Sequence, residues 1–119
     1  MSTINIARQF SLTPGPRFRD EGPHSGEDFR ERFLRPAFEL ALKMGEKIII
    51  ELDGVRFGYP SSFLEEAFGQ LARDYGIEPV LKQLEFRSIE EPGLRDEICG
   101  YILDANKTSP ERAVGSRGR

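Results

Sequence analysis

The chain has 119 residues, of which 38% are hydrophobic and 31% charged. This size suits one globular domain, and no apolar run approaches the roughly 18 residues that a membrane-spanning helix needs, so we expect no membrane insertion. The first ten residues lack the basic start and continuous apolar stretch of a secretion signal. Cys99 is the single cysteine, which excludes an internal disulfide and a multi-cysteine zinc site. We therefore expect a cytoplasmic protein.

The formal net charge of −3 is unevenly distributed. Residues 26–106 contain 10 basic and 17 acidic side chains, a net charge of −7, whereas residues 107–119 carry +3. An acidic body repels phosphate backbones, which argues against nucleic-acid binding. We predict one domain over residues 1–106 and a disordered basic tail over residues 107–119.

Two features precede the first predicted helix. Ile4, Ile6 and Phe10 lie at even spacing, which predicts a half-buried strand over about residues 3–11. Six of the fourteen positions in residues 13–26 are Pro or Gly, which predicts a long irregular loop inside the domain. Loops of this length are often functional.

The spacing Ser25-x-x-Asp28 resembles a capping box and predicts a helix that ends at Gly45. Pro36 should kink this helix near Arg32 or begin a second helical segment. The apolar residues at helical spacing are Phe29, Phe33, Ala37, Leu40, Ala41 and Met44.

A second helix is expected to begin at Ser62, which has capping-box spacing to Glu65, and to end at Gly76. A third helix should follow Pro92. Strands are predicted over residues 47–55 and 79–88 because both stretches are rich in apolar residues. This alternation of strands and helices predicts an α/β fold with parallel central strands.

The residue types of common active sites are scarce. His24 is the single histidine and lies in the Pro/Gly-rich loop, where we expect it to be exposed. Cys99 lies on an apolar helical stripe, beside acidic residues that disfavour a thiolate. We therefore predict no catalytic residue, no metal site and no cofactor.

Two charged groups have alternative interpretations. Glu51 and Asp53 could form an acid/base pair or bind a cation, but they could equally pair with a neighbouring strand and form a turn. Arg17 and Arg19 could bind an anion through paired donors. The alternative is that they balance the acidic residues around them.

The strand-to-helix junction before the second helix carries Ser61 and Ser62. A helix N-terminus favours a phosphate, so either serine is a candidate phosphorylation site. The alternative is that Ser62 only caps the helix. Glu65 and Glu66, one turn later, would repel an added phosphate.

Three stretches resemble the STAS-like family of small bacterial proteins of unknown function, over roughly residues 8–105. They are Gly15 to Phe29, Ile48-Ile-Ile-Glu-Leu-Asp-Gly-Val55 and Gly58-Tyr-Pro-Ser-Ser-Phe-Leu-Glu-Glu-Ala-Phe-Gly69.

The broader resemblance is to STAS domains of anti-sigma factor antagonists. It implies a mixed sheet of four or five strands with helices packed mainly on one face. In the antagonists, a histidine-kinase-like ATPase phosphorylates a serine in an Asp-Ser-Ser-Gly motif and binds the surrounding surface. Ser61 and Ser62 fall at the matching junction, with Pro60 and Phe63 in place of the Asp and the Gly.

We therefore hypothesise a non-enzymatic interaction or regulatory domain that resembles an anti-sigma factor antagonist. Its expected partner is a histidine-kinase-like ATPase or an anti-sigma factor. The expected partner-binding residues are Tyr59, Pro60, Ser61, Ser62 and Phe63, with Tyr59 and Phe63 as apolar anchors.

Two alternatives remain open. The first is a small ligand-binding protein or enzyme that uses Glu51, Asp53 and the loop containing Arg17 and Arg19. The second is a homo-oligomeric scaffold, in the simplest case a homodimer, that buries Phe18 or the kinked helix.

Overall fold

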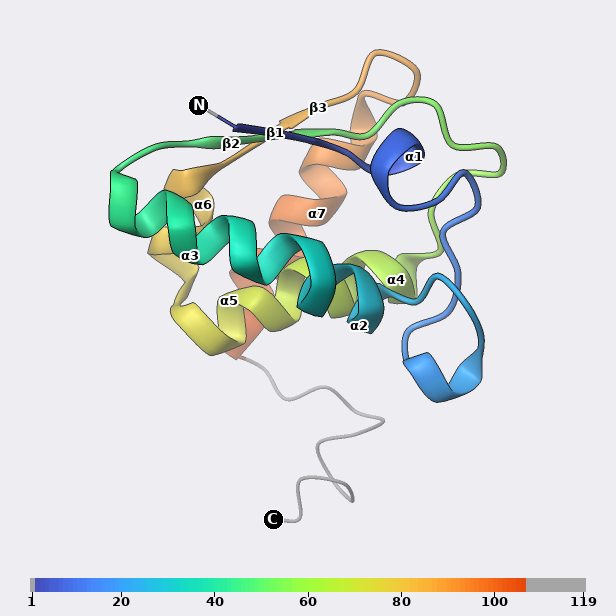
Figure 1. Cartoon of the computed structure of the whole chain (residues 1–119), viewed down its shortest axis with the longest axis horizontal. Coiled ribbons are helices and arrows are strands. Elements are labelled where there is room, and N and C mark those ends of the chain that lie inside the picture. The colour runs from blue at the N-terminus through green and yellow to red at the C-terminus, as the bar shows by residue number, and fades with distance from the viewer. Residues whose placement is uncertain (1, 107–119) are drawn as a thin grey trace.

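Three parallel strands form the centre of the molecule in a computed structural model, which describes residues 2–106. The strands are β1 (Ser2–Asn5), β2 (Ile48–Glu51) and β3 (Leu84–Arg87), in the order β1-β2-β3. All the long helices lie on one side of this sheet (Figure 1).

Helical segments lie in each of the two connections between strands. They also form the C-terminal part of the fold. After β1 come α1 (Ile6–Gln9), a 3₁₀ turn (Arg19–Glu21), α2 (Gly26–Phe29), the π-helical segment η2 (Arg30–Leu34) and α3 (Arg35–Met44). After β2 come α4 (Ser61–Leu64), the π-helical segment η3 (Glu65–Gly69), α5 (Gln70–Tyr75) and α6 (Ile77–Gln83). After β3 come α7 (Gly93–Leu103) and a final 3₁₀ turn (Asp104–Asn106).

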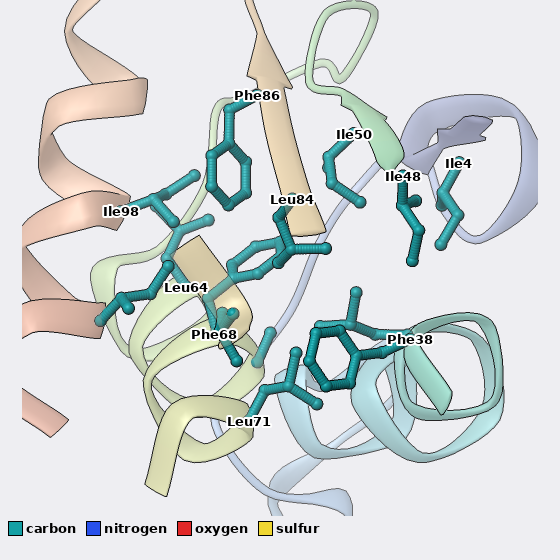
Figure 2. Close-up of a cluster of buried hydrophobic side chains, with 14 of the residues drawn as sticks. Ile4, Phe38, Ile48, Ile50, Leu64, Phe68, Leu71, Leu84, Phe86 and Ile98 are labelled. Carbon is teal, nitrogen blue, oxygen red and sulfur yellow. The ribbon is translucent and has the colours of Figure 1, made fainter. Parts of the chain in front are cut away.

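The core lies between the sheet and the helices. Ile4, Ile50 and Phe86 occupy matching positions on the three strands, and each is at most 5% exposed. Figure 2 shows these side chains on the same side of the sheet as Phe38 and Phe68. The next register position carries Asn5, Glu51 and Arg87. Because side chains alternate along a strand, these three polar residues lie on the face away from the helices.

The strand predictions need correction. The first strand ends at Asn5 because the Asn5 side chain accepts a hydrogen bond from Arg8 N and begins α1. The stretch predicted as a strand over residues 79–88 is helical up to Gln83. Residues 2–106 thus form three parallel strands, and the expected mixed sheet of four or five strands is wrong. The placement of the helices on one face is confirmed.

The helix predicted between Ser25 and Gly45 is confirmed. Ser25 Oγ accepts a hydrogen bond from Asp28 N at 2.9 Å, and Gly45 ends the helix with φ of 69°. Pro36 lies in the first turn of α3, directly after the π-helical segment η2. A proline lacks the N–H of a regular helical hydrogen bond, so this position begins a second helical segment as predicted.

The N-cap of the second helix, α4 to α5, lies two residues earlier than predicted. Pro60 occupies the N-cap position, and no side chain caps the first turn. Ser61 and Ser62 are therefore the first two helical residues, and the predicted capping role of Ser62 is wrong. Pro60 fits this position because its φ of −60° and ψ of 140° are non-helical, as an N-cap residue requires.

The Pro/Gly-rich loop has a defined backbone conformation. Its two ends are joined by hydrogen bonds from Gly15 N to His24 O at 2.8 Å and from Gly26 N to Pro16 O at 2.9 Å. His24 is exposed, as expected, and has a positive φ of 60°.

No helix within residues 2–106 has both the length and the apolar character needed to span a bilayer. The predicted basic tail, residues 107–119, lies outside the described residues.

Candidate protein-interaction surface

The loops that follow β2 and β3 leave the sheet at the same end, as the parallel strands require (Figure 1). The first runs over residues 52–60 and the second over residues 88–92. Ligands of α/β proteins commonly bind at this carboxyl edge, because loops there can vary without disturbing the sheet.

Asp53 joins the two loops. Its carboxylate accepts hydrogen bonds from Ser88 Oγ at 2.9 Å, Ile89 N at 2.9 Å and Glu90 N at 3.1 Å. Gly54 N donates in return to Glu90 Oε1 at 3.0 Å. The hydrogen bond from the Ile89 N–H, supported by those from Ser88 and Glu90, holds the pKa of Asp53 below its ordinary value. Asp53 is therefore a charged residue that positions both loops.

Large apolar side chains project from these loops. Phe57 is 86% exposed and Ile89 is 89% exposed. Leu12, from the segment after α1, is 46% exposed, and its carbonyl accepts a hydrogen bond from Arg56 N at 2.9 Å. Exposed apolar groups that gather in one region mark interaction sites. We call Leu12, Phe57 and Ile89, with the cleft between the two loops, the carboxyl-edge surface.

The cleft between the loops has a volume of about 90 Å³. Its apolar lining comes from Leu52, Val55, Tyr59 and Leu94, and its carboxylates from Asp53, Glu90 and Glu91. Tyr59 Oη donates to Leu52 O at 2.7 Å, and burial raises the pKa of Tyr59 above its ordinary value. Small-molecule sites usually measure about 300–1,000 Å³, so this cleft is too small for a nucleotide or a typical cofactor.

The predicted partner-binding residues differ in their exposure. Pro60 and Ser61 are exposed, whereas Tyr59 and Ser62 are half-buried. Phe63 is fully buried, and its ring centroid lies 5.9 Å from that of Phe29. Phe63 thus belongs to the core, and the prediction of an exposed anchor at this position does not agree with its burial.

The carboxylates one turn after the serines are both paired with arginines. Glu65 binds Arg17 and, at 2.8 Å, Arg73 Nη1, while Glu66 Oε2 binds Arg30 Nη1 at 2.7 Å. Burial opposes the charge of Glu65, but the hydrogen bonds from Arg73 and Arg17 lower its pKa overall. Three guanidinium groups surround two carboxylates here, so the repulsion expected for a phosphate at the junction is offset.

Residues 25–94, more than half of the chain, match the family described as STAS-like domain of unknown function (DUF4325). The chain belongs to this family. The match includes the helix from α2 to α3, strand β2, the junction around Ser61 and Ser62, and strand β3. No curated protein and no solved structure gave a significant match.

The two arginines proposed to bind an anion make ion pairs within the STAS-like domain. Arg17 binds Glu65 and lies 3.5 Å from Glu66, whereas Arg19 Nε binds Asp28 at 3.0 Å. The alternative interpretation, that these arginines balance nearby acidic residues, fits these contacts.

The residues of the enzyme alternative converge only in part. Glu51 lies 3.7 Å from Arg87, and Glu51 and Asp53 line one hollow of about 390 Å³, but the lining of that hollow includes neither Arg17 nor Arg19. Within residues 2–106, no three His, Cys, Asp or Glu side chains are placed to hold a metal ion.

The STAS-like domain contains a buried ion pair that was not predicted from the sequence. Arg30 and Glu66 are 6% and 5% exposed, and each lies in one of the two π-helical segments. The available signal was helical spacing, since Arg30 precedes buried Leu34 by four residues and Glu66 follows buried Phe63 by three. Opposite charges on the apolar faces of two helices point to a buried pair.

Proposed function

We propose that this STAS-like domain is a non-enzymatic interaction and regulatory module whose partner binds the carboxyl-edge surface. The observation that carries the proposal is the exposure of Phe57 and Ile89 on two loops that Asp53 fixes to one another. The apolar surface of such side chains is removed from water only when a partner covers it. Phe57, which was not among the predicted anchors, therefore takes the anchor role that was predicted for Phe63.

The partner that the STAS resemblance favours is a histidine-kinase-like ATPase or an anti-sigma factor. Ser61 is exposed on the first turn after Tyr59 and Pro60, close to the cleft. Its hydroxyl is also a neighbour of the Tyr101 phenol on α7. A phosphate on Ser61 or Ser62 would add charge beside the partner-binding surface, which is how such a modification changes affinity.

The test is affinity capture from the native host with a tagged chain. We expect a partner that is retained by the wild type and by Leu103→Ser but lost with Phe57→Ser. Leu103 is a matched control because it is 57% exposed at the end of α7, outside the carboxyl-edge surface. Intact-mass measurement under several growth conditions tests phosphorylation. No partner and no added phosphate under any condition would overturn the proposal.

A homodimer is a second proposal, supported by the exposed side of α3. Leu40 and Met44 are 58% and 60% exposed on α3. Phe18, by contrast, is only 9% exposed and offers little surface. Sedimentation over a concentration range tests this proposal, and a concentration-independent monomer would contradict it.

A further inference from the structure

We propose that the cleft of the carboxyl-edge surface receives one lysine or arginine side chain, presented by the partner between large apolar residues. This inference rests on the proposed function, because it specifies the chemistry of the partner at the same surface. Three independent properties of the cleft support it: its size, its charge and the side chains at its two sides.

The size of the cleft fits one long side chain. About 90 Å³ is enough for the stem of a lysine or arginine but not for a nucleotide. The apolar lining from Leu52, Val55 and Leu94 can contact methylene groups. Lysine and arginine commonly bury their stems in this way while the charged end stays at the polar rim.

The charge of the cleft selects a cation. Asp53, Glu90 and Glu91 contribute three carboxylates, and the lining of the cleft includes no lysine or arginine. Asp53 remains ionised because its three hydrogen-bond donors stabilise the carboxylate. Glu91 makes no side-chain ion pair or hydrogen bond within residues 2–106, so its carboxylate is available to a partner. An acidic or phosphorylated segment would be repelled here.

The side chains beside the cleft define what flanks the cation. Phe57 belongs to the loop that supplies Val55 and Gly58. Ile89 lines a neighbouring hollow that shares Asp53 and Ser88 with the cleft. The partner residues next to the one that enters the cleft can therefore contact exposed apolar groups. A basic residue with apolar neighbours satisfies both requirements, which gives the recognition its specificity.

The inference can be tested by selecting peptides from a random display library on the immobilised full chain. We expect enriched peptides to carry Lys or Arg beside a large apolar residue. Synthetic copies should bind Glu91→Gln about tenfold more weakly, and should weaken with salt. Glu78→Gln is the matched control, since Glu78 is exposed on α6, away from the cleft, and should leave the affinity unchanged.

The outcomes separate this inference from the proposed function. If Phe57→Ser weakens binding but Glu91→Gln does not, the cation site is overturned and the interaction surface stands. If neither variant nor Ile89→Ser weakens binding, the peptides bind elsewhere and the site is overturned together with the surface. Enrichment of peptides without a basic residue, or of none above background, also overturns the inference.

Discussion

Arg30 binds Glu66 twice across the two long helices: its Nη1 donates to Glu66 Oε2 and to the Glu66 carbonyl, both at 2.7 Å. The pair is buried, and it joins the two π-helical segments. π-Helical turns are uncommon and leave the regular hydrogen-bond pattern. The extra hydrogen bond to the Glu66 carbonyl fixes the second helix directly after the junction that carries Ser61 and Ser62.

Removing Arg30 should destabilise the fold strongly. Arg30→Met removes the shorter of the two ion pairs of the buried Glu66 carboxylate and leaves it only Arg17, 3.5 Å away, so we expect the free energy of unfolding to fall by about 3 kcal/mol. Urea denaturation measures this change. Arg32→Met removes an i,i+4 pair with Asp28 and a cation–π contact with Phe33, and it should cost about 1 kcal/mol. The double variant Arg30→Met/Glu66→Met should recover part of the loss, and no recovery would contradict this account.

Gly26 is required by the close approach of α2 to the second helix. A Cβ atom at Gly26 would lie 2.5 Å from the Phe63 carbonyl oxygen. We expect Gly26→Ala to lower the free energy of unfolding by about 1–3 kcal/mol, because the two helices must separate. Gly100→Ala on α7 meets no atom within 4 Å and should instead stabilise by about 0.5–1 kcal/mol. Equal effects in thermal unfolding would refute the explanation.

Phe63 and Phe57 should respond in opposite ways to truncation. Phe63 is fully buried, so Phe63→Ala should cost about 3–5 kcal/mol of stability. Phe57 is 86% exposed, and Phe57→Ala should change stability by no more than about 0.5 kcal/mol. Denaturant titration of both variants checks this contrast. A large loss of stability in Phe57→Ala would show that Phe57 packs within the domain.

Glu65 should make part of the stability depend on pH. Burial alone would raise its pKa, but Arg73 and Arg17 bring it below the ordinary value of 4.5. The ionised form is therefore favoured by folding, so its contribution is complete above about pH 4.5 and is lost as the pH falls through the lower folded value. Glu65→Gln should be less stable than the wild type at pH 7.

The difference in stability between Glu65→Gln and the wild type should then shrink as the pH falls below 4.5. Urea denaturation at a series of pH values measures it. Glu78→Gln, which changes an exposed residue, serves as the control and should show no such trend. A difference that stays constant down to pH 3 would contradict the assignment of Glu65.

Local sequence patterns predicted much of the fold. The helix from Ser25 to Gly45, its interruption at Pro36 and the helix after Pro92 all occur as expected. The strand boundaries were less well predicted, because Asn5 begins a helix inside a stretch with strand-like alternation. Capping and proline signals act within a few residues, so they can be recognised without knowledge of the fold.

The candidate surface was harder to predict than the fold. The sequence alone indicated the junction around Tyr59 to Phe63 but not which aromatic side chains are exposed there. Phe57 and Phe63 are equally apolar, and only the packing of the second helix against α2 buries one and leaves the other in water.

The sequence by itself determined the α/β class, the order of most elements and the membership of one family, because these depend on short-range spacing and motifs. The tertiary structure decided which charges meet. Asp53 joins two loops 35 residues apart, and Arg30 binds Glu66 across 36 residues. Such pairs depend on which helix faces and strand ends come together, and no local pattern specifies that.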